Sequence, residues 1–436
     1  MWQLTWQVDG WIITAGALCG IAAALLGNFL VLRRMSLIGD AISHAILPGL
    51  AAAYLITGER QGWFMFAGAA VVGVLTVILA EIAREFGRVD EGAAIGVVFT
   101  FLFALGLVMI VRAADRVDLD PGCVLYGAIE TTLADLMPVG SWLVPRAVVT
   151  LTIVTVINLF CVVLLYRPLK VSTFDPQLAQ SQGIPVRWLH YLLASLVAIT
   201  SVAAFETAGN ILVVAMFVVP PVTAWLWTDR LWLMIVLSAC LAIMAAIGGH
   251  LAAIGVPALF GLPSTNTAGM MAVVSGCLLV LTALIATRKG LISRAYRTWR
   301  VSQHILGEDM LGWLYRHSPQ GLQSVATTEL ERAIMAPNWR CRLALGRLRR
   351  RGWIENLGGQ IRLSASGLTM AQNVVRGHRL WEHYLAAEAG LPEELLHDGA
   401  ERLEHFTDRQ LRDRLHVETN APTTDPHGKS IPPEAL

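Results

Sequence analysis

CxxC cysteine pairs, a basic region in the first ten residues and a nucleotide-binding loop are all missing from this chain. The six cysteines are scattered without a CxxC pair, which excludes a disulfide framework, and we interpret them as small buried hydrophobes. The first residues, MWQLTWQVDG, include no basic region, so we expect the first apolar stretch to be a retained span. No GxxxxGK[ST] segment occurs, so we expect no ATP hydrolysis by the chain itself and no enzyme.

Charge is also scarce, and it is unevenly spread. Of the 436 residues, 55% are hydrophobic and only 15% are charged. Residues 301–436 nevertheless hold 33 of the 65 charged residues and eight of the 11 histidines. This distribution predicts a polytopic membrane domain followed by a soluble, histidine-rich tail. Neither part has a large net charge, so bulk charge does not indicate a nucleic-acid partner.

The membrane domain contains about nine stretches that are long and apolar enough to cross a bilayer. Pairs of basic residues fall on alternate junctions between them, which predicts that these junctions are cytoplasmic, that the N-terminus is outside and that the tail is inside. The predicted spans are 11–31, 37–57, 62–82, 93–112, 142–166, 187–207, 209–228, 231–253 and 267–287.

Asp40 and His44 lie four residues apart in the second predicted span. That spacing puts a carboxylate and an imidazole on one face of a helix. Ionisable groups at membrane depth are costly and commonly mark an ion or substrate path. One oxygen and one nitrogen ligand suit a divalent transition metal. The alternative interpretation is a polar pair that only packs helices together.

The loop between the fifth and sixth spans predicts a short cytoplasmic helix. Asp175 is a suitable N-cap, Pro176 suits the first helical position, and Gly183 suits the end. An amphipathic helix of this kind is a device for docking a soluble partner. The alternative is an ordinary interfacial loop.

Three segments then resemble the permease subunits of zinc, manganese and iron ABC importers. They are RRMSLIGDAISHAILPG, FDPQLAQSQGIPVRWLHYLL and AGNILVVAMFVVPPVTA, and the resemblance covers nearly all of residues 10–290. It implies a homodimer or paired permease in the bacterial inner membrane, in which Asp40 and His44 line the metal path. It also implies a separate cytoplasmic ATPase that binds the 175–183 helix, including Ala179, and an extracytoplasmic metal-binding protein.

The tail begins with a basic connector, residues 291–304, which we expect to lie at the lipid surface. Helices at 305–316, 325–335 and 338–351 are followed by two short strands around Gly358-Gly359, the order of a winged helix. The third helix is rich in arginine and predicts DNA binding. Binding to anionic lipid, or dimerisation of the tail, are the alternatives. The arginines that we expect to contact DNA are Arg340, Arg342 and Arg347.

Two further helices, about 366–389 and 393–418, concentrate metal-ligand residue types. His378 and Glu382 are an i, i+4 pair, and His397 lies one turn before Glu401, Glu404 and His405 on the second helix. Carboxylates and imidazoles without thiolates favour Mn²⁺ or Fe²⁺, with zinc as a further option. The alternative is a solvated face held by salt bridges.

The same region resembles the metal-dependent repressors of the diphtheria-toxin-repressor and manganese-regulator family. The segments that carry this resemblance are GHRLWEHYL, HDGAERLEHFTD and DPHGKSIP. It implies that Glu401, Glu404 and His405 form the effector site, joined by Asp309, and that His378, Glu382 and His397 form a neighbouring site. Gly312 departs from the manganese type, which has a carboxylate one turn after the position of Asp309.

Together these patterns predict a mainly α protein. The expected domains are a membrane permease at 1–290, the connector at 291–304, a winged helix at 305–365 and a helical metal-binding and dimerisation region at 366–436. The predicted function is the permease subunit of an ABC importer for divalent metal ions with a metal-sensing domain. The alternative is a membrane-tethered, metal-dependent transcriptional repressor.

Overall fold

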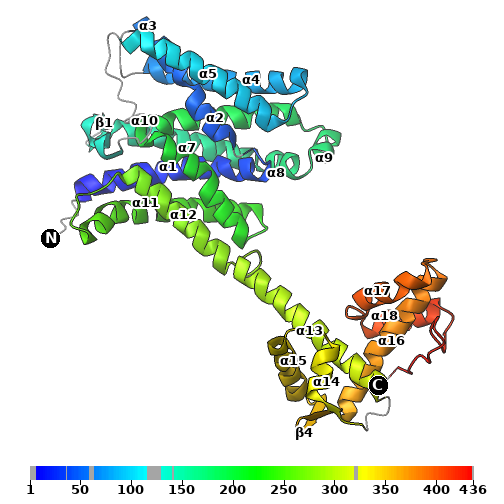
Figure 1. The fold of residues 1–436 in the computed structure, drawn as a ribbon. Coiled ribbons are helices and arrows are strands. Elements are labelled where there is room, and N and C mark those ends of the chain that lie inside the picture. The colour runs from blue at the N-terminus through cyan, green and yellow to red at the C-terminus, as the bar shows by residue number, and fades with distance from the viewer. Residues whose placement is uncertain are drawn as a thin grey trace. The chain divides into compact units, whose positions relative to one another are not determined.

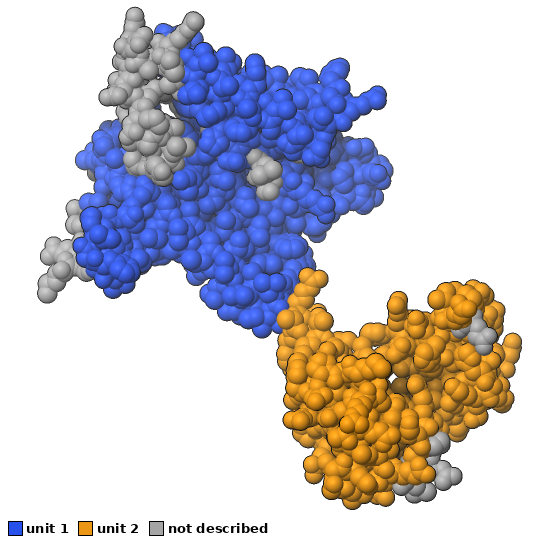
Figure 2. Space-filling view, in the orientation of Figure 1, with its two compact units in different colours: residues 1–293 blue, residues 294–436 orange. Residues whose placement is uncertain are grey.

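The structure is a computed structural model that describes residues 6–35, 37–57, 63–114, 129–139, 142–318 and 323–434. The chain divides into two compact units (Figure 2), unit 1 from Met1 to Ser293 and unit 2 from Arg294 to Leu436. The predicted mainly helical fold, with a membrane domain followed by a helical repressor-like region, is confirmed.

Unit 1 is a helix bundle (Figure 1) in which eight described helices are long and apolar enough to cross a membrane, with α2 and α3 taken as one span. A short antiparallel hairpin, β1 Leu136–Val139 and β2 Trp142–Pro145, precedes α7. The helices are α1 Trp6–Leu32, α2 Leu37–Ala45, α3 Leu47–Thr57, α4 Trp63–Gly87, α5 Glu91–Ala114, η1 Ile129–Ala134, α7 Arg146–Leu164, α8 Tyr166–Phe174, α9 Pro176–Ser181, α10 Val186–Trp227, α11 Leu231–Leu259 and α12 Thr267–Ile285.

Helix α10 is interrupted at Gly209. Its 42 residues would form a straight helix about 63 Å long, which is about twice the hydrocarbon thickness of a bilayer. Gly209 instead has non-helical angles, φ 75° and ψ 167°, in a region that is essentially restricted to glycine. The two halves on either side of Gly209 match the predicted spans 187–207 and 209–228.

Contacts near the two ends of α10 indicate that the chain reverses its direction between them, at Gly209. Arg33, directly after α1, donates to Thr173 in α8 (3.1 Å), shortly before α10 begins. Asn28, near the end of α1, donates to Ser238 early in α11 (2.8 Å), shortly after α10 ends. Both ends of α10 therefore lie at the end of the bundle where α1 ends, which we name the α9 end. Counted as two crossings, α10 brings the spans to the predicted nine.

Small residues let α1 pass through the middle of the bundle. A Cβ at Gly27 would collide with the carbonyl of Phe217 in α10, so only glycine permits this approach. Buried polar groups are paired across helices, as where Asn158 of α7 donates to Thr200 of α10 (2.8 Å). Such pairing is required because lipid offers no alternative partner.

The second predicted span is broken into α2 and α3. Residue Ile46 is a turn between them, and Pro48 has no N–H to donate to the carbonyl of His44. Asp40 and His44 therefore lie on a short helix of nine residues that ends at the break. Broken helices of this kind line binding sites in transporters.

Unit 2 begins with a winged helix, as predicted. Helix α13, Leu291–His317, includes most of the predicted connector and the predicted 305–316 helix without interruption. The strands pair in the order β3-β5-β4. Gly358 and Gly359 both have positive φ and form the two-residue turn that joins β4 to β5. The remaining elements are β3 Val325–Ala326, α14 Thr327–Ala333, α15 Asn338–Arg350, β4 Ile354–Leu357 and β5 Gln360–Leu363.

Three helices complete unit 2, where two were expected. Helix α16 spans Ala365–Ala387, but the predicted 393–418 helix is divided into α17 Glu393–Glu404 and α18 Arg409–Glu418. The division is at Asp408, which caps α18 by accepting from the backbone N–H of Leu411 (2.8 Å). His405 therefore lies at the end of α17, where its side chain is buried.

Candidate metal sites

The first candidate site lies where the two broken spans of unit 1 meet. His44 Nε2 is 3.6 Å from Asp40 Oδ1, and Asn210 Nδ2 is 2.8 Å from the same His44 nitrogen. Asn210 directly follows the break at Gly209. Its Oδ1 is buried and has no hydrogen-bond partner in the described residues. A carboxylate, an imidazole and an unpaired amide oxygen together form a donor set that suits a divalent cation.

The surroundings of His44 are apolar on the side of α5. The rings of Phe99 and Phe103 lie with their centroids 5.7 and 5.8 Å from the His44 ring. The Asp40 side chain is 47% exposed in the single chain. The site is therefore walled on one side and open on the carboxylate side, as an ion path requires.

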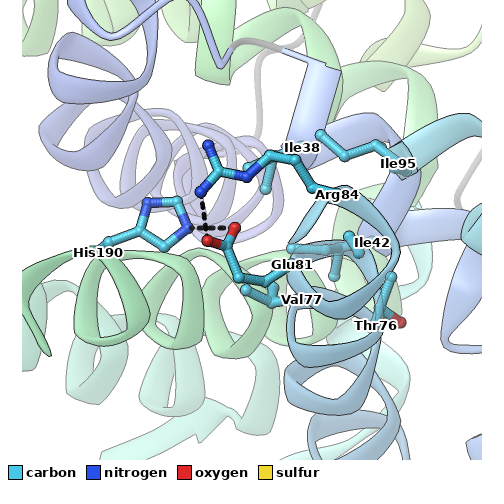
Figure 3. Close-up of a pocket in the computed structure, with 10 residues that line it drawn as sticks. Ile38, Ile42, Thr76, Val77, Glu81, Arg84, Ile95 and His190 are labelled. Atoms are coloured by element: carbon cyan, nitrogen blue, oxygen red, sulfur yellow. Dashed lines mark hydrogen bonds and ion pairs between the residues drawn. The ribbon is translucent and has the colours of Figure 1, made fainter. Parts of the chain in front are cut away.

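A second cluster lies against a different face of α2 (Figure 3), and the sequence did not indicate it. Glu81 of α4 forms an ion pair with Arg84 on the same helix and lies 4.0 Å from His190 of α10. Ile38 and Ile42 of α2 line the same pocket. Because Arg84 already supplies the positive charge for Glu81, this cluster suits a tie between α4 and α10 better than a metal site.

In unit 2, the first metal-ligand cluster joins α16 to α17. His378 Nε2 lies 3.0 Å from Glu382 Oε1 and 3.0 Å from His397 Nδ1, and these last two atoms are 3.2 Å apart. Donor atoms about 2.1 Å from an octahedral ion are about 3.0 Å apart, against about 3.4 Å for a tetrahedral ion. The three donor atoms therefore lie close enough together for one ion to contact all of them.

The second metal-ligand cluster of unit 2 joins α13 to the end of α17. His405 Nε2 lies 3.1 Å from Asp309 Oδ1 and 3.5 Å from Glu404 Oε1. The other oxygen of Glu404 lies 2.5 Å from His378 Nδ1 in the first cluster. Glu404 thus touches both clusters, a position suited to a carboxylate between two neighbouring metal sites.

Two residues that the sequence interpretation missed support these clusters. Glu308 accepts from His405 Nδ1 (2.8 Å), which orients the ring as a second carboxylate commonly does for a ligating histidine. His427 Nε2 lies 3.9 Å from Glu382 Oε1. Its position in the DPHGKSIP segment, which carried the repressor resemblance, was the available signal.

Glu401 is not brought into either cluster. It is exposed and is not among the two groups of three residues found in the described chain. The structure therefore groups Asp309, Glu404 and His405, and separately His378, Glu382 and His397, but leaves Glu401 outside both.

The clusters hold protons in the absence of metal. Burial alone would lower the pKa of His378, but hydrogen bonds with Glu382 and Glu404 outweigh it and raise that pKa to about 9. Burial would also lower the pKa of His405, but its hydrogen bonds with Asp309 and Glu308 outweigh this effect and raise that pKa to about 10. Burial would raise the pKa of Glu382, yet its bonds to His378 and His397 lower it to about 2. A metal ion must displace these imidazole protons in order to bind.

The predicted docking helix is α9. Asp175 caps it by accepting from the backbone N–H of Leu178 (2.9 Å), Pro176 is its first residue, and Gly183 follows it with φ 75°. Ala179 is fully buried, so its methyl group packs within the chain rather than on the outer face of α9. Leu178 is 47% exposed and is the apolar side chain that α9 presents.

The arginines of α15 are partly engaged within unit 2. Arg340 donates to Ser302 of α13, and the guanidinium of Arg347 lies 4.6 Å from the centre of the Trp299 ring. Arg342 is exposed. Of the three arginines predicted to contact DNA, two therefore contact α13.

The model of the ABC 3 transport family matches residues 8–287. The chain belongs to this family. A second model, the metal binding and dimerisation domain of iron dependent repressors, matches residues 364–433. Both resemblances that the sequence indicated are confirmed, and the chain is a multi-pass membrane permease with a repressor-like domain.

Individual relatives agree with the family. The manganese transport system membrane protein MntD of Bacillus subtilis is 37% identical over 300 residues, which cover 69% of this chain and 99% of MntD. The zinc transport system membrane protein TroD of Treponema pallidum is 33% identical over 366 residues, covering 83% of this chain and 97% of TroD. The solved structure of PsaBC from Streptococcus pneumoniae in complex with Fab matches with a TM-score of 0.53 and 28% identity, covering 64% of this chain and 92% of that chain.

Metal binding by unit 2 should strengthen as pH rises. His378 and His405 carry raised pKa values of about 9 and 10, so at neutral pH each ion must displace their protons. With one proton displaced, affinity should rise about tenfold per pH unit between pH 6 and 8. Calorimetry of Mn²⁺ binding in buffers of different ionisation enthalpy measures both the affinity and the protons released.

The folding stability of unit 2 without bound metal has the opposite pH dependence. Raised histidine pKa values stabilise the empty fold fully below about pH 6.5, and that stability is lost as pH rises through 9 to 10. Metal affinity that does not change from pH 6 to 8 would contradict the proton competition.

Proposed function

We propose that this chain is the permease subunit of an ABC importer for divalent transition metal ions, Mn²⁺, Zn²⁺ or Fe²⁺, and that unit 2 senses the metal. The observation that carries the transport proposal is the meeting of Asp40, His44 and the unpaired Oδ1 of Asn210 at two helix breaks. Few ligands on an open path bind an ion weakly enough to release it. The manganese and zinc transport relatives support the same cargo.

The α9 end of unit 1 is proposed to face the cytoplasm, with the first residues of the chain outside. Basic residues gather at this end, including Arg33 beside α8 and Lys289, which pairs with Asp229 directly after α10 (2.6 Å). A cytoplasmic ATPase would then dock on α9, and an extracytoplasmic metal-binding protein would deliver the ion. A second permease copy would complete the path.

The metal in unit 2 is proposed to be Mn²⁺ or Fe²⁺. Asp309 and Glu404 with His405 bring together two carboxylates and one imidazole, and donor sets that are rich in oxygen suit Mn²⁺. When bound there, the ion would link α16 and α17 and, through Glu404, also α13. Its role is to report the metal level by fixing these helices together.

Regulation of the permease is the better-supported role for unit 2, and transcriptional repression is the alternative. Ser302 and Trp299 on the connector side of α13 engage Arg340 and Arg347 of α15. DNA would have to compete with these contacts for the same guanidinium groups. The exposed Arg342 remains available to phosphate.

Replacing either transport ligand should abolish uptake. Asp40→Asn and His44→Gln keep the side-chain volume but remove the charge or the imidazole donor, so ⁵⁴Mn accumulation in cells or proteoliposomes should fall by at least about tenfold. His190→Gln is the matched control, because this histidine lies against a different face of α2. Uptake near the wild-type level in both site variants, with normal membrane insertion, would refute the transport site.

Docking of the ATPase should depend on Leu178. A Leu178→Asp change places a charge on the exposed apolar side chain of α9, and it should uncouple ATP hydrolysis from transport while leaving insertion intact. Leu262→Asp is the control, since this exposed leucine follows α11 at the opposite end of the bundle. Equal loss of coupling in both variants would assign the effect to general destabilisation.

Sensing should depend on Glu404 but not on Glu401. Glu404→Gln removes the carboxylate that touches both clusters, so uptake should no longer decline when internal manganese rises. Glu401→Gln changes the same residue type one turn earlier on α17, outside both clusters, and should behave as wild type. Loss of regulation in Glu401→Gln as well as in Glu404→Gln would favour the ligand set implied by the repressor resemblance.

A further inference from the structure

A cavity of about 460 Å³ lies within unit 2, between α13 and the C-terminal part of α15. It lies outside the transport path, and it shares Glu308 with the surroundings of the metal clusters. Its size is within the range of small-molecule sites, about 300 to 1,000 Å³. The side chains that give it its chemistry are Arg300, Gln303, Arg347, Arg350, Arg351 and Trp353.

Gln303 is the feature that marks this cavity as a built site. The residue is only 2% exposed, and both atoms of its side-chain amide lack a hydrogen-bond partner in the described residues. A buried amide left without partners is costly, and native proteins rarely retain one without a ligand or water to satisfy it. Gln303 borders the cavity. Because both of its amide atoms are buried, a bound molecule would pair with them after a rotation of the side chain.

The charge around Gln303 is positive and uncompensated. The four arginines that line the cavity have no carboxylate partner among the described residues of unit 2. Two of them lie over aromatic rings, Arg347 on Trp299 at 4.6 Å and Arg351 on Trp353 at 4.8 Å, which holds the guanidinium groups in defined orientations.

One carboxylate also lines the cavity, but it is already engaged. Glu308 contacts His405 at 2.8 Å and His304 at 3.4 Å. Its charge is therefore directed to imidazoles rather than to the arginines. Guanidinium groups in this arrangement recognise phosphate oxygens through paired hydrogen bonds.

We propose that this cavity binds a phosphate-bearing ligand, with the arginines holding the phosphoryl oxygens and Gln303 reading a neighbouring polar group. A single phosphate would not fill about 460 Å³, so the ligand carries a further polar part. That chemistry can come from the headgroup of an anionic phospholipid or from a soluble phosphate compound. The proposal is independent of the transport function.

The test uses the full chain in nanodiscs of phosphatidylcholine, in phosphate-free buffer. Calorimetry follows the addition of short-chain dihexanoyl phosphatidylglycerol in one arm and of glycerol phosphate and inorganic phosphate in the other. Binding of the lipid alone assigns a membrane source, and binding of the soluble phosphates assigns a free one; either result supports the site.

Variants locate the binding. Arg300→Ala and Gln303→Leu should each weaken it by about tenfold or more, because each removes a hydrogen bond to a charged group. Arg349→Ala is the matched control, since this exposed arginine of α15 does not line the cavity, and it should change affinity by less than about twofold. Thermal melting of each variant verifies the fold, and Arg300→Ala, at an exposed position, tests the site if Gln303→Leu does not fold.

Three outcomes would overturn the proposal. The first is that calorimetry detects no heat of binding for any of the probes at millimolar concentration. The second is equal weakening by Arg349→Ala and Arg300→Ala, which would indicate surface charge alone. The third is binding only to a duplex DNA added in a separate arm, which would assign the arginines of α15 to nucleic acid.

Discussion

Lipid supplies no hydrogen bonds, and this constraint governs where the polar groups of unit 1 lie. Asp40 and His44 lie on the second span near two helix breaks, at Ile46 before Pro48 and at Gly209 before Asn210. Each break frees backbone and side-chain polar groups that need a partner. The buried Oδ1 of Asn210 has no hydrogen-bond partner among the described residues, so it is available to an ion.

Local sequence patterns predicted the part of the candidate transport site that lies on a single helix. The i, i+4 spacing gave Asp40 and His44, and the two glycines gave the turn between β4 and β5. Asn210 could not be found in this way, because its contact with His44 spans 166 residues and depends on the conformation of Gly209. The inward side of Ala179 also needed coordinates, since a helix of six residues has too few positions to define its buried face.

The tail illustrates the same limit. Helical periodicity placed Glu401 with Glu404 and His405, but the chain leaves the helix after Glu404, where α17 ends, so His405 turns toward α13 and meets Asp309 and Glu308. This helix end separates His405 from Glu401 and Glu404, which both lie on α17, and in the sequence Asp408, an N-cap residue, was the available signal for it. Tertiary contacts, not spacing, select the ligands.

The candidate sites of unit 1 and unit 2 differ in how strongly protons compete with a metal ion for the ligands. In unit 1 the Asp40 carboxylate is half exposed and His44 is held by a single amide, so an ion meets little competition and can leave readily. In unit 2 the imidazoles of His378 and His405 are buried among carboxylates and hold their protons strongly. An ion bound there would have to overcome that competition, in exchange for a fuller donor set. A weak and open site suits transport of an ion. A buried site, at which the ion must displace protons, suits sensing of the same ion.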